Sequence, residues 1–285
     1  MSAKVSTFSR GVTFVSSGET GTQANEFEAA IKSVTSSTTV GAVFVYDTRN
    51  DSDSGAWRKK ARGSWYYETL NTATRGGRRE FPSVALIVAD GGSTDTLSIY
   101  DLDDPAMPMW MVFEQNTGDA CQNSGYDATS VFALNGQIFV GFGTNGGLRS
   151  FNFADDSATS YRHAAGTTGK YLGNLAERND AKTFAGTSES LIVNSAVNDV
   201  SATIVEGSEL GALGLPIPTV AVATGGGLSV IHPNGDVYDK ATTSAAATLV
   251  EFDKDGNLYA GQDQYISRFD LSTLYADASN TYLSS

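Results

Sequence analysis

The stretch that decides the fold class runs from Val220 to His232. It reads Val220-Ala221-Val222-Ala223-Thr224-Gly225-Gly226-Gly227-Leu228-Ser229-Val230-Ile231-His232. Two short apolar runs flank three glycines, which is typical of two strands joined by a tight turn. This stretch therefore predicts an antiparallel β-hairpin.

The same layout occurs at three other places in the chain, in residues 86–101, 138–152 and 258–270. The second strands of the four hairpins begin at residues 97, 148, 228 and 266. These separations fit one or two units of about 40 to 50 residues, which is the repeat length of propeller blades. Each hairpin is therefore expected to form the middle of a four-stranded blade.

The rest of the chain also predicts strands. Short runs of Val, Ile, Thr, Phe and Tyr alternate with Gly, Asn and Asp, and one short helix is expected near residues 25–32. The expected strands are Val40–Tyr46, Trp57–Tyr67, Val84–Ala89, Leu97–Tyr100, Met109–Phe113, Val131–Leu134, Ile138–Phe142, Leu148–Phe153, Ser190–Asn194, Thr219–Ala223, Leu228–Ile231, Thr248–Phe252, Asn257–Ala260 and Ile266–Phe269. We expect an all-β fold, a β-propeller-like array of about five short four-stranded blades, with a β-sandwich as the alternative.

The length of 285 residues allows one large β domain. We expect residues 1–285 to form a single propeller-like domain, with residues 1–35 supplying a closing strand and the short helix. A ring of blades closes when strands from the two chain ends share a blade. Thr281–Ser285 would complete a blade begun by Val5–Phe8 and Val12–Ser16, or the chain continues beyond Ser285 in a longer protein.

Composition and charge argue against several classes of protein. The chain has 19 Lys and Arg against 32 Asp and Glu, so sequence-specific binding of nucleic acid is not expected. No signal-like segment begins the chain, and the longest apolar run, Val84–Ala89, is too short to insert into a membrane. The single Cys121 has no partner for an internal disulfide.

Residues that could form a metal or cofactor site are sparse. His163 and His232 are the only histidines, and neither has the spacing of a zinc site or a catalytic triad. The acidic loop Asp47–Gly55 places carboxylates at positions that suit Ca²⁺, but it lacks the closing Glu of a hand-type loop. We expect no metal and no cofactor.

Paired carboxylates are the remaining candidates for catalysis. Asp103-Asp104 and Asp155-Asp156 could in principle hydrolyse a polysaccharide. Adjacent residues of a strand point to opposite faces, however, so such pairs are more typical of solvated loops. We expect the protein not to be an enzyme.

Positive charge is concentrated between Ala56 and Glu80. This segment carries seven Lys and Arg against two Glu, interleaved with Trp and Tyr. Arg and aromatic residues are enriched where proteins meet, so the segment predicts a subunit contact, and the alternative is a strand pair with a basic solvent face. The candidate contact residues are Arg58, Lys59, Lys60, Arg62, Trp65, Tyr66, Arg75, Arg78 and Arg79.

Residues 57–113 contain an ordered series of motifs. They are Trp57-Arg58-Lys59-Lys60, Ser64-Trp65-Tyr66, Leu70-Asn71-Thr72-Ala73-Thr74-Arg75-Gly76, Arg79-Glu80-Phe81-Pro82-Ser83-Val84-Ala85, Ile99–Pro105 and Pro108-Met109-Trp110-Met111-Val112-Phe113. The series resembles a signature of virion structural proteins of marine tailed bacteriophages. The resemblance implies a tail component, either a propeller-bearing nozzle protein or a fibre-associated protein, and it implies no enzymatic residues.

Together these features predict a structural protein of a phage tail. It would be made in the host cytoplasm and would act in the virion as a rigid assembly and docking module, in contact with other tail subunits and as a homo-oligomer. One alternative is a receptor or glycan-binding module at the tail tip, with Tyr126, Tyr161 and Tyr171 exposed to host-surface sugars. The other is a polysaccharide hydrolase.

Overall fold

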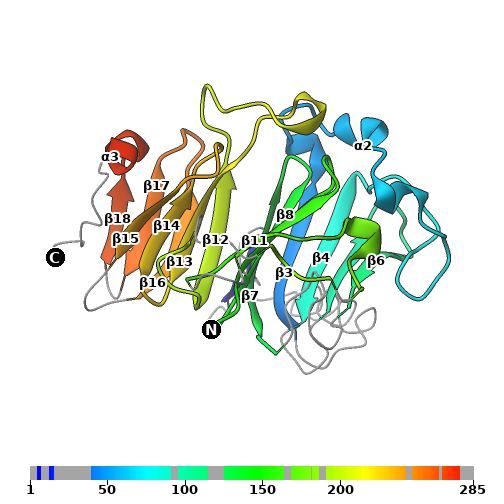
Figure 1. The fold of residues 1–285 in the computed structure, drawn as a ribbon, viewed down its shortest axis with the longest axis horizontal. Coiled ribbons are helices and arrows are strands. Elements are labelled where there is room, and N and C mark those ends of the chain that lie inside the picture. The colour runs from blue at the N-terminus through cyan, green and yellow to red at the C-terminus, as the bar shows by residue number, and fades with distance from the viewer. Residues whose placement is uncertain are drawn as a thin grey trace.

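The computed structural model describes residues 5–7, 13–15, 40–90, 96–114, 125–163, 168–180, 182–185, 191–241, 246–262 and 265–276. Within these residues the protein consists mainly of β-strands (Figure 1). Most of the strands belong to four antiparallel sheets of three to five strands. The predicted all-β fold class is confirmed.

Each of the four sheets is built from strands that follow one another in sequence. The first sheet contains β3 (Val40–Asp47), β4 (Val84–Asp90), β5 (Leu97–Asp101) and β6 (Met109–Phe113). The second contains β7 (Ala128–Leu134), β8 (Gln137–Phe142), β9 (Gly147–Asn152), β10 (Ser157–Tyr161) and β11 (Gly169–Lys170). The third contains β12 (Val197–Thr203), β13 (Thr219–Thr224), β14 (Gly227–Ile231) and β15 (Val237–Ala241). The last contains β16 (Ala247–Phe252), β17 (Leu258–Gln262) and β18 (Tyr265–Phe269).

The other elements are short. β1 (Val5–Thr7) and β2 (Thr13–Val15) pair with each other in a separate two-stranded sheet. The helical turns are η1 (Thr48–Asn50), α2 (Trp57–Lys60), η2 (Ser64–Tyr67), η3 (Leu175–Glu177), η4 (Ala212–Gly214) and α3 (Leu271–Ala276). None of the helices among the described residues has the length and apolarity needed to cross a bilayer. The helix expected near residues 25–32 and the strand expected at Thr281–Ser285 lie outside the described residues, as does Cys121.

The four predicted hairpins are the second and third strands of the four sheets. They correspond to the pairs β4–β5, β8–β9, β13–β14 and β17–β18. The described residues contain four such sheets, whereas the sequence predicted about five. The difference arises in the long interval between residues 148 and 228, where β10 and β11 extend the second sheet, η3 follows them, and β12 and β13 begin the third.

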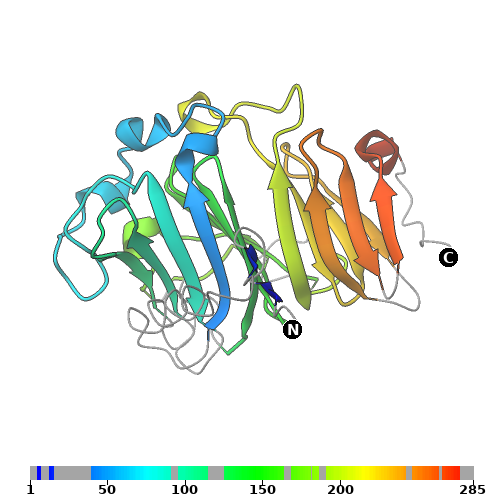
Figure 2. The same cartoon turned by 180° about the vertical axis from the view of Figure 1, so that it is seen from behind.

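The first strands of successive sheets lie against one another. β3 contacts β7, β7 contacts β12, and β12 contacts β16. This order is consistent with the predicted propeller-like arrangement, in which the first strand of each blade is innermost and the later strands lead outward. Figures 1 and 2 show the sheets in this order along the long axis of the molecule, from β3–β6 at one end to β16–β18 at the other.

Alternation of side chains along the strands explains the stacking. In β8, Ile138 packs in the core shared with the first sheet, while Phe139 packs in the core shared with the third. In β13, Val222 faces the second sheet and Ala223 faces the last. Neighbouring residues of a strand point to opposite faces, so a continuously apolar strand is buried between two sheets.

Two strands predicted from the sequence are not formed. Trp57–Tyr67 folds as α2 and η2, and its buried residues Trp57, Ala61 and Trp65 have the four-residue spacing of a helix rather than the alternation of a strand. The described part of Ser190–Asn194, residues 191–194, is irregular, and the strand that follows it is β12. β12 was not predicted because its polar residues interrupt the apolar pattern by which strands were recognised.

Candidate functional site

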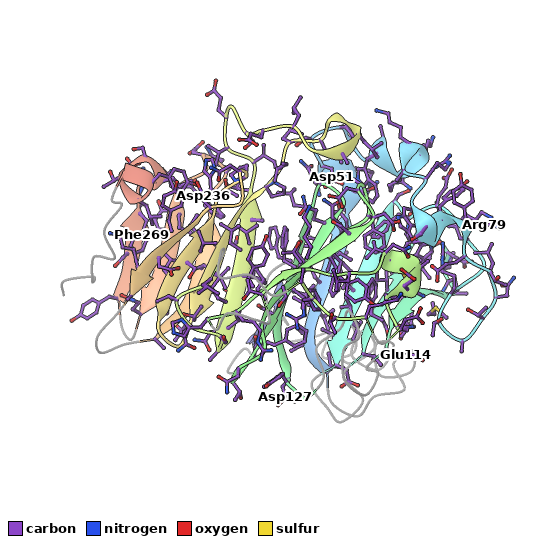
Figure 3. All side chains as sticks on the ribbon, in the orientation of Figure 1. Asp51, Arg79, Glu114, Asp127, Asp236 and Phe269 are labelled. Carbon is purple, nitrogen blue, oxygen red and sulfur yellow. The ribbon has the colours of Figure 1, made fainter. Side chains whose placement is uncertain are left out.

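The predicted contact segment lies in the connection between β3 and β4. Residues 48–83 leave the first sheet, form η1, α2 and η2, and return to begin β4 (Figure 1). Figure 3 shows Arg79 at the margin of the molecule, at the opposite end of the long axis from Phe269 in β18. The segment therefore belongs to the first sheet and is remote from the last.

The tryptophans of the segment belong to the core. Trp65 is 0% exposed, its ring centroid lies 5.7 Å from that of Trp110 and 5.5 Å from that of Phe153, and its indole N–H donates to the carbonyl of Phe153 at 3.0 Å. Trp57 is also fully buried and packs against Phe81. The prediction of Trp65 as a contact residue is therefore wrong, because its aromatic surface is used between the first and second sheets.

A buried carboxylate holds the start of this connection. Asp51 accepts hydrogen bonds from the hydroxyl of Tyr46 at 2.6 Å, the indole N–H of Trp57 at 2.7 Å and the backbone N–H of Asn135 at 2.8 Å. Burial raises the pKa of Asp51, while these hydrogen bonds oppose the rise. Since Asn135 lies in the turn between β7 and β8, Asp51 fastens the first sheet to the second (Figure 3).

The acidic loop Asp47–Gly55 does not converge on a cation. Asp51 points into the protein, and the carboxylate of Asp47 binds the guanidinium of Arg49 at 2.6 Å. Within the described ranges no group of three or more His, Cys, Asp or Glu is placed to hold a metal ion. Asp47 and Asp51 therefore have structural partners, whereas both carboxylate oxygens of Asp53 are buried without a hydrogen-bond partner among the described residues.

Arg75 is a buried structural residue. It is 1% exposed, and its guanidinium carbon lies 4.4 Å from the ring centroid of Trp110. Its Nη1 donates to the carbonyl of Trp110 at 2.8 Å and its Nη2 donates to the carbonyl of Arg79 at 2.9 Å. Burial lowers the pKa of Arg75 to about 10. The prediction of Arg75 as a surface contact is wrong, because its guanidinium is buried and donates to backbone carbonyls within the protein.

Glu68 lies between two buried arginines. Its Oε1 accepts from Nη1 of Arg178 at 2.6 Å, and its Oε2 lies 3.6 Å from Nε of Arg75. Burial raises the pKa of Glu68, and the two guanidinium charges oppose that rise. Arg178 directly follows η3, after the last strand of the second sheet, and no sequence pattern predicts its role. Only the folded chain brings this triad of charges together.

The surface part of the segment is called here the basic patch. It comprises the exposed residues Lys59, Lys60, Arg62, Tyr67 and Arg79 and the half-buried Tyr66, which packs against the core. The guanidinium carbon of Arg62 lies 4.2 Å from the ring centroid of Tyr66, and Nη1 of Arg79 donates to the carbonyl of Tyr66 at 2.7 Å. Tyr67 is 68% exposed. Lys59 and Lys60 are exposed and make no ion pair with the described part of the chain.

Arg58 and Arg78 are half-buried and have partners on the protein. Nη1 of Arg58 donates to the carbonyl of Phe81 at 2.8 Å. Nη1 of Arg78 donates to Asp101 at 2.9 Å and to Asp103 at 2.7 Å. Arg78 and these aspartates line an open pocket of about 760 Å³ beside the β5–β6 hairpin. The guanidinium groups of both arginines are therefore already hydrogen-bonded to other residues of the chain.

The paired aspartates have structural partners. Asp103 accepts from the backbone N–H of Ser83 at 2.8 Å. Burial by itself raises the pKa of Asp103, but hydrogen bonds from Ser83, Arg78 and Val84 outweigh it and lower the pKa to about 2. This direction is the opposite of what a general acid requires. Asp156 accepts from the N–H of Ser64 at 2.8 Å and thereby ties η2 to the second sheet.

The tyrosines expected at a glycan site are not exposed together. Tyr171 is buried, and its hydroxyl donates to the carbonyl of Glu177 at 2.7 Å. Tyr161 packs in the core between the second and third sheets, and burial raises its pKa to about 12. Tyr126 is half-buried, with the guanidinium carbon of Arg162 5.3 Å from its ring centroid. The expectation that these three residues form an exposed binding face is wrong.

No protein-family model matches this chain, and no curated protein matches it either.

Proposed function

We propose that this protein is a structural component of a tailed-phage virion, located in the tail, where it acts as a rigid assembly and docking module and not as an enzyme. The observation that carries the proposal is the basic patch, whose segment is anchored in the core by its own buried side chains. The resemblance of residues 57–113 to virion structural proteins supports the assignment to a phage particle.

The buried base makes the basic patch a preformed surface. Trp65 and Arg75 lie in the core beneath it, and Glu68 and Asp156 tie its backbone to the second sheet. A surface that is ordered before its partner arrives loses less conformational entropy on binding. This construction suits a contact that must form repeatedly in one geometry, as subunit contacts in a tail do.

The chemistry of the basic patch selects an acidic protein surface as its partner. The patch gathers Lys and Arg on a chain whose formal charge is −13, so its sign differs from that of most of the molecule. Charge complementarity speeds association and excludes partners of the wrong sign. The proposed partners are other tail subunits and the acidic surface of a neighbouring copy, and the chain is made in the host cytoplasm before assembly.

The experiment that tests this function uses particles purified on a gradient. Quantitative peptide mass spectrometry and antibody labelling under the electron microscope measure the copies of the protein and their position. In parallel, the variant Lys59→Glu/Lys60→Glu is expressed in place of the wild type. Its matched control is Lys170→Glu/Lys254→Glu, which changes the same charge at two exposed lysines outside the patch.

We expect the wild type and the control at the tail in equal numbers, and about tenfold fewer copies of the Lys59→Glu/Lys60→Glu variant, because like charges across an interface are strongly unfavourable. Circular dichroism checks that the variant is folded. Absence of the wild type from clean particles would contradict the virion assignment. Equal incorporation of all three proteins would reject the patch as the contact.

A further inference from the structure

The outward face of the last sheet is open. Leu249 of β16 is 42% exposed and Ile266 of β18 is 71% exposed. These side chains belong to the face opposite Val250 and Ala260, which are buried against the third sheet. In Figure 1 this sheet stands at one end of the series, with β18 as its outermost strand. The last sheet carries apolar side chains on both faces, and among the described residues only one of these faces is buried against another sheet.

The open face continues the stacking surfaces inside the molecule. In the second and third sheets both faces are buried, as Ile138 and Phe139 of β8 and Val222 and Ala223 of β13 illustrate. Stacked sheets lie about 10 Å apart and fill the space between them with interdigitating side chains. The last sheet offers the same kind of surface to a further sheet.

The side chains of the open face form two rows across the three strands. The first row is Leu249, Gly261 and Ile266, since Gly261 of β17 pairs with Leu249 on one side and with Ile266 on the other. The second row places Glu251 of β16 and Arg268 of β18 on either side of Tyr259. The face is thus apolar in one row and carries opposite charges at the two ends of the next.

These rows are self-complementary about one axis. A two-fold rotation about an axis parallel to β17 places β16 of one copy over β18 of the other at the same height along the strands. Glu251 then lies over Arg268 of the second copy, Leu249 lies over Ile266, and Tyr259 lies over its equivalent. Gly261 leaves the centre of the apolar row without a side chain, which gives Leu249 and Ile266 of both copies room to interdigitate.

We propose that a second copy of this chain stacks on the open face of the last sheet, related to the first by a two-fold axis along β17. Each of the two copies uses the same residues, as isologous contacts require. The charges of Glu251 and Arg268 fix the register, and the apolar row supplies the buried area. This inference goes beyond the proposed function, because it concerns a contact at the end of the molecule away from the basic patch and applies to the purified chain in solution.

The test is sedimentation equilibrium of the purified full chain over a range of concentrations. The wild type is expected to form a dimer, and Ile266→Glu is expected to weaken its Kd at least tenfold, because a charge would be buried between two apolar rows. Leu249→Glu provides a second variant of the same row. Leu172→Glu is the control, since Leu172 is exposed in the segment that follows β11, at a distance from the proposed contact.

Charge reversal tests the axis itself. Glu251→Arg and Arg268→Glu are each expected to weaken dimerisation several-fold, whereas the double variant Glu251→Arg/Arg268→Glu is expected to restore it, because both ion pairs are re-formed with their signs exchanged. A wild type that stays monomeric, or a dimer that none of these variants weakens, overturns the proposal. Failure of the double variant to recover overturns the two-fold arrangement. Any of these results leaves incorporation into particles, and hence the proposed function, to be judged by its own experiment.

Discussion

The first sheet (β3–β6) and the last sheet (β16–β18) are the two ends of the same series, yet their outward faces differ. In the first sheet Leu86, Val88 and Tyr100 form a buried cluster on the face turned away from the second sheet. In the last sheet the corresponding face exposes Leu249 and Ile266. Repeated hairpins of one design therefore do not decide which face is covered.

The two end sheets also differ in what is attached to them. The first sheet carries residues 48–83, which are fastened by Asp51, Trp65 and the triad of Glu68, Arg75 and Arg178. The last sheet carries α3, whose Leu274 packs in the core shared with the third sheet. A fastened end suits the presentation of a fixed surface, whereas an open end suits stacking.

The largest effect is expected at Trp65. Trp65→Ala should lower the free energy of unfolding by about 3 to 5 kcal/mol, because it removes a fully buried aromatic ring from the core between the first two sheets. Urea unfolding measures the change. Tyr67→Ala is the control two residues away on the same turn, and since Tyr67 is exposed, it should change stability by less than about 0.5 kcal/mol. Similar losses for the two variants would contradict the division of the segment into a buried base and an exposed patch.

The next effect is expected at Glu68. Glu68→Leu should destabilise the protein by about 3 kcal/mol, because it leaves the buried guanidinium groups of Arg75 and Arg178 without their counter-charge. Glu68→Gln retains an acceptor for Arg178 and should cost less, as urea unfolding would show. Equal losses for the two variants would mean that the charge, which both substitutions remove, accounts for the role of Glu68, and that the hydrogen-bond acceptor retained only by Gln contributes little.

A smaller effect is expected from pH. Because the pKa of Asp103 is about 2 in the folded chain and near 3.8 in an unfolded one, Asp103 contributes stability above about pH 4 that is lost as the pH falls through 2. Asp103→Asn should therefore show a shallower loss of stability between pH 4 and pH 2 than the wild type. Asp51 and Glu68, whose pKa values are raised, act in the opposite sense but are present in both proteins. Parallel curves from urea unfolding across this range would contradict the assignment.

The smallest effect is expected at Ile266. In the dilute monomer Ile266→Ala should change the free energy of unfolding by less than about 0.5 kcal/mol, because the side chain is largely exposed. The same substitution at Ile87 in the first sheet is the matched comparison and should cost about 2 to 5 kcal/mol, since Ile87 is fully buried. A large loss for Ile266→Ala in dilute solution would show that the last sheet is not open in the monomer.

The hairpins were predictable from the sequence because their signal is local. Alternation, apolar runs and Gly-rich turns are set by residues close together in the chain, and Val220–Ile231 became β13 and β14 with only its ends adjusted. The tryptophans and tyrosines of Trp57–Tyr67 have high strand propensity, and for that reason a strand was predicted there. The buried positions of the segment instead follow a helical spacing. That spacing is the signal that would have identified α2 and η2.

The candidate site was predictable only in part. The exposed lysines and arginines of the basic patch could be picked out by charge, but the burial of Trp65 and Arg75 depends on Phe153 and Trp110, which come from other parts of the chain. Arg178 could not be found at all, because it reaches Glu68 from 110 residues away. Burial and ion pairing are properties of neighbours in space, and sequence patterns report neighbours along the chain.

By itself, then, the sequence determined the all-β class, the four central hairpins and the concentration of positive charge in residues 56–80. The tertiary structure decided how many sheets stack, which charges are buried beneath the patch, and that Leu249 and Ile266 remain open on the last sheet. The physical reason is the distance along the chain over which the responsible interactions act. Strand formation follows from alternation over a few residues, whereas the covering of a sheet face depends on which other sheet or segment arrives to bury it.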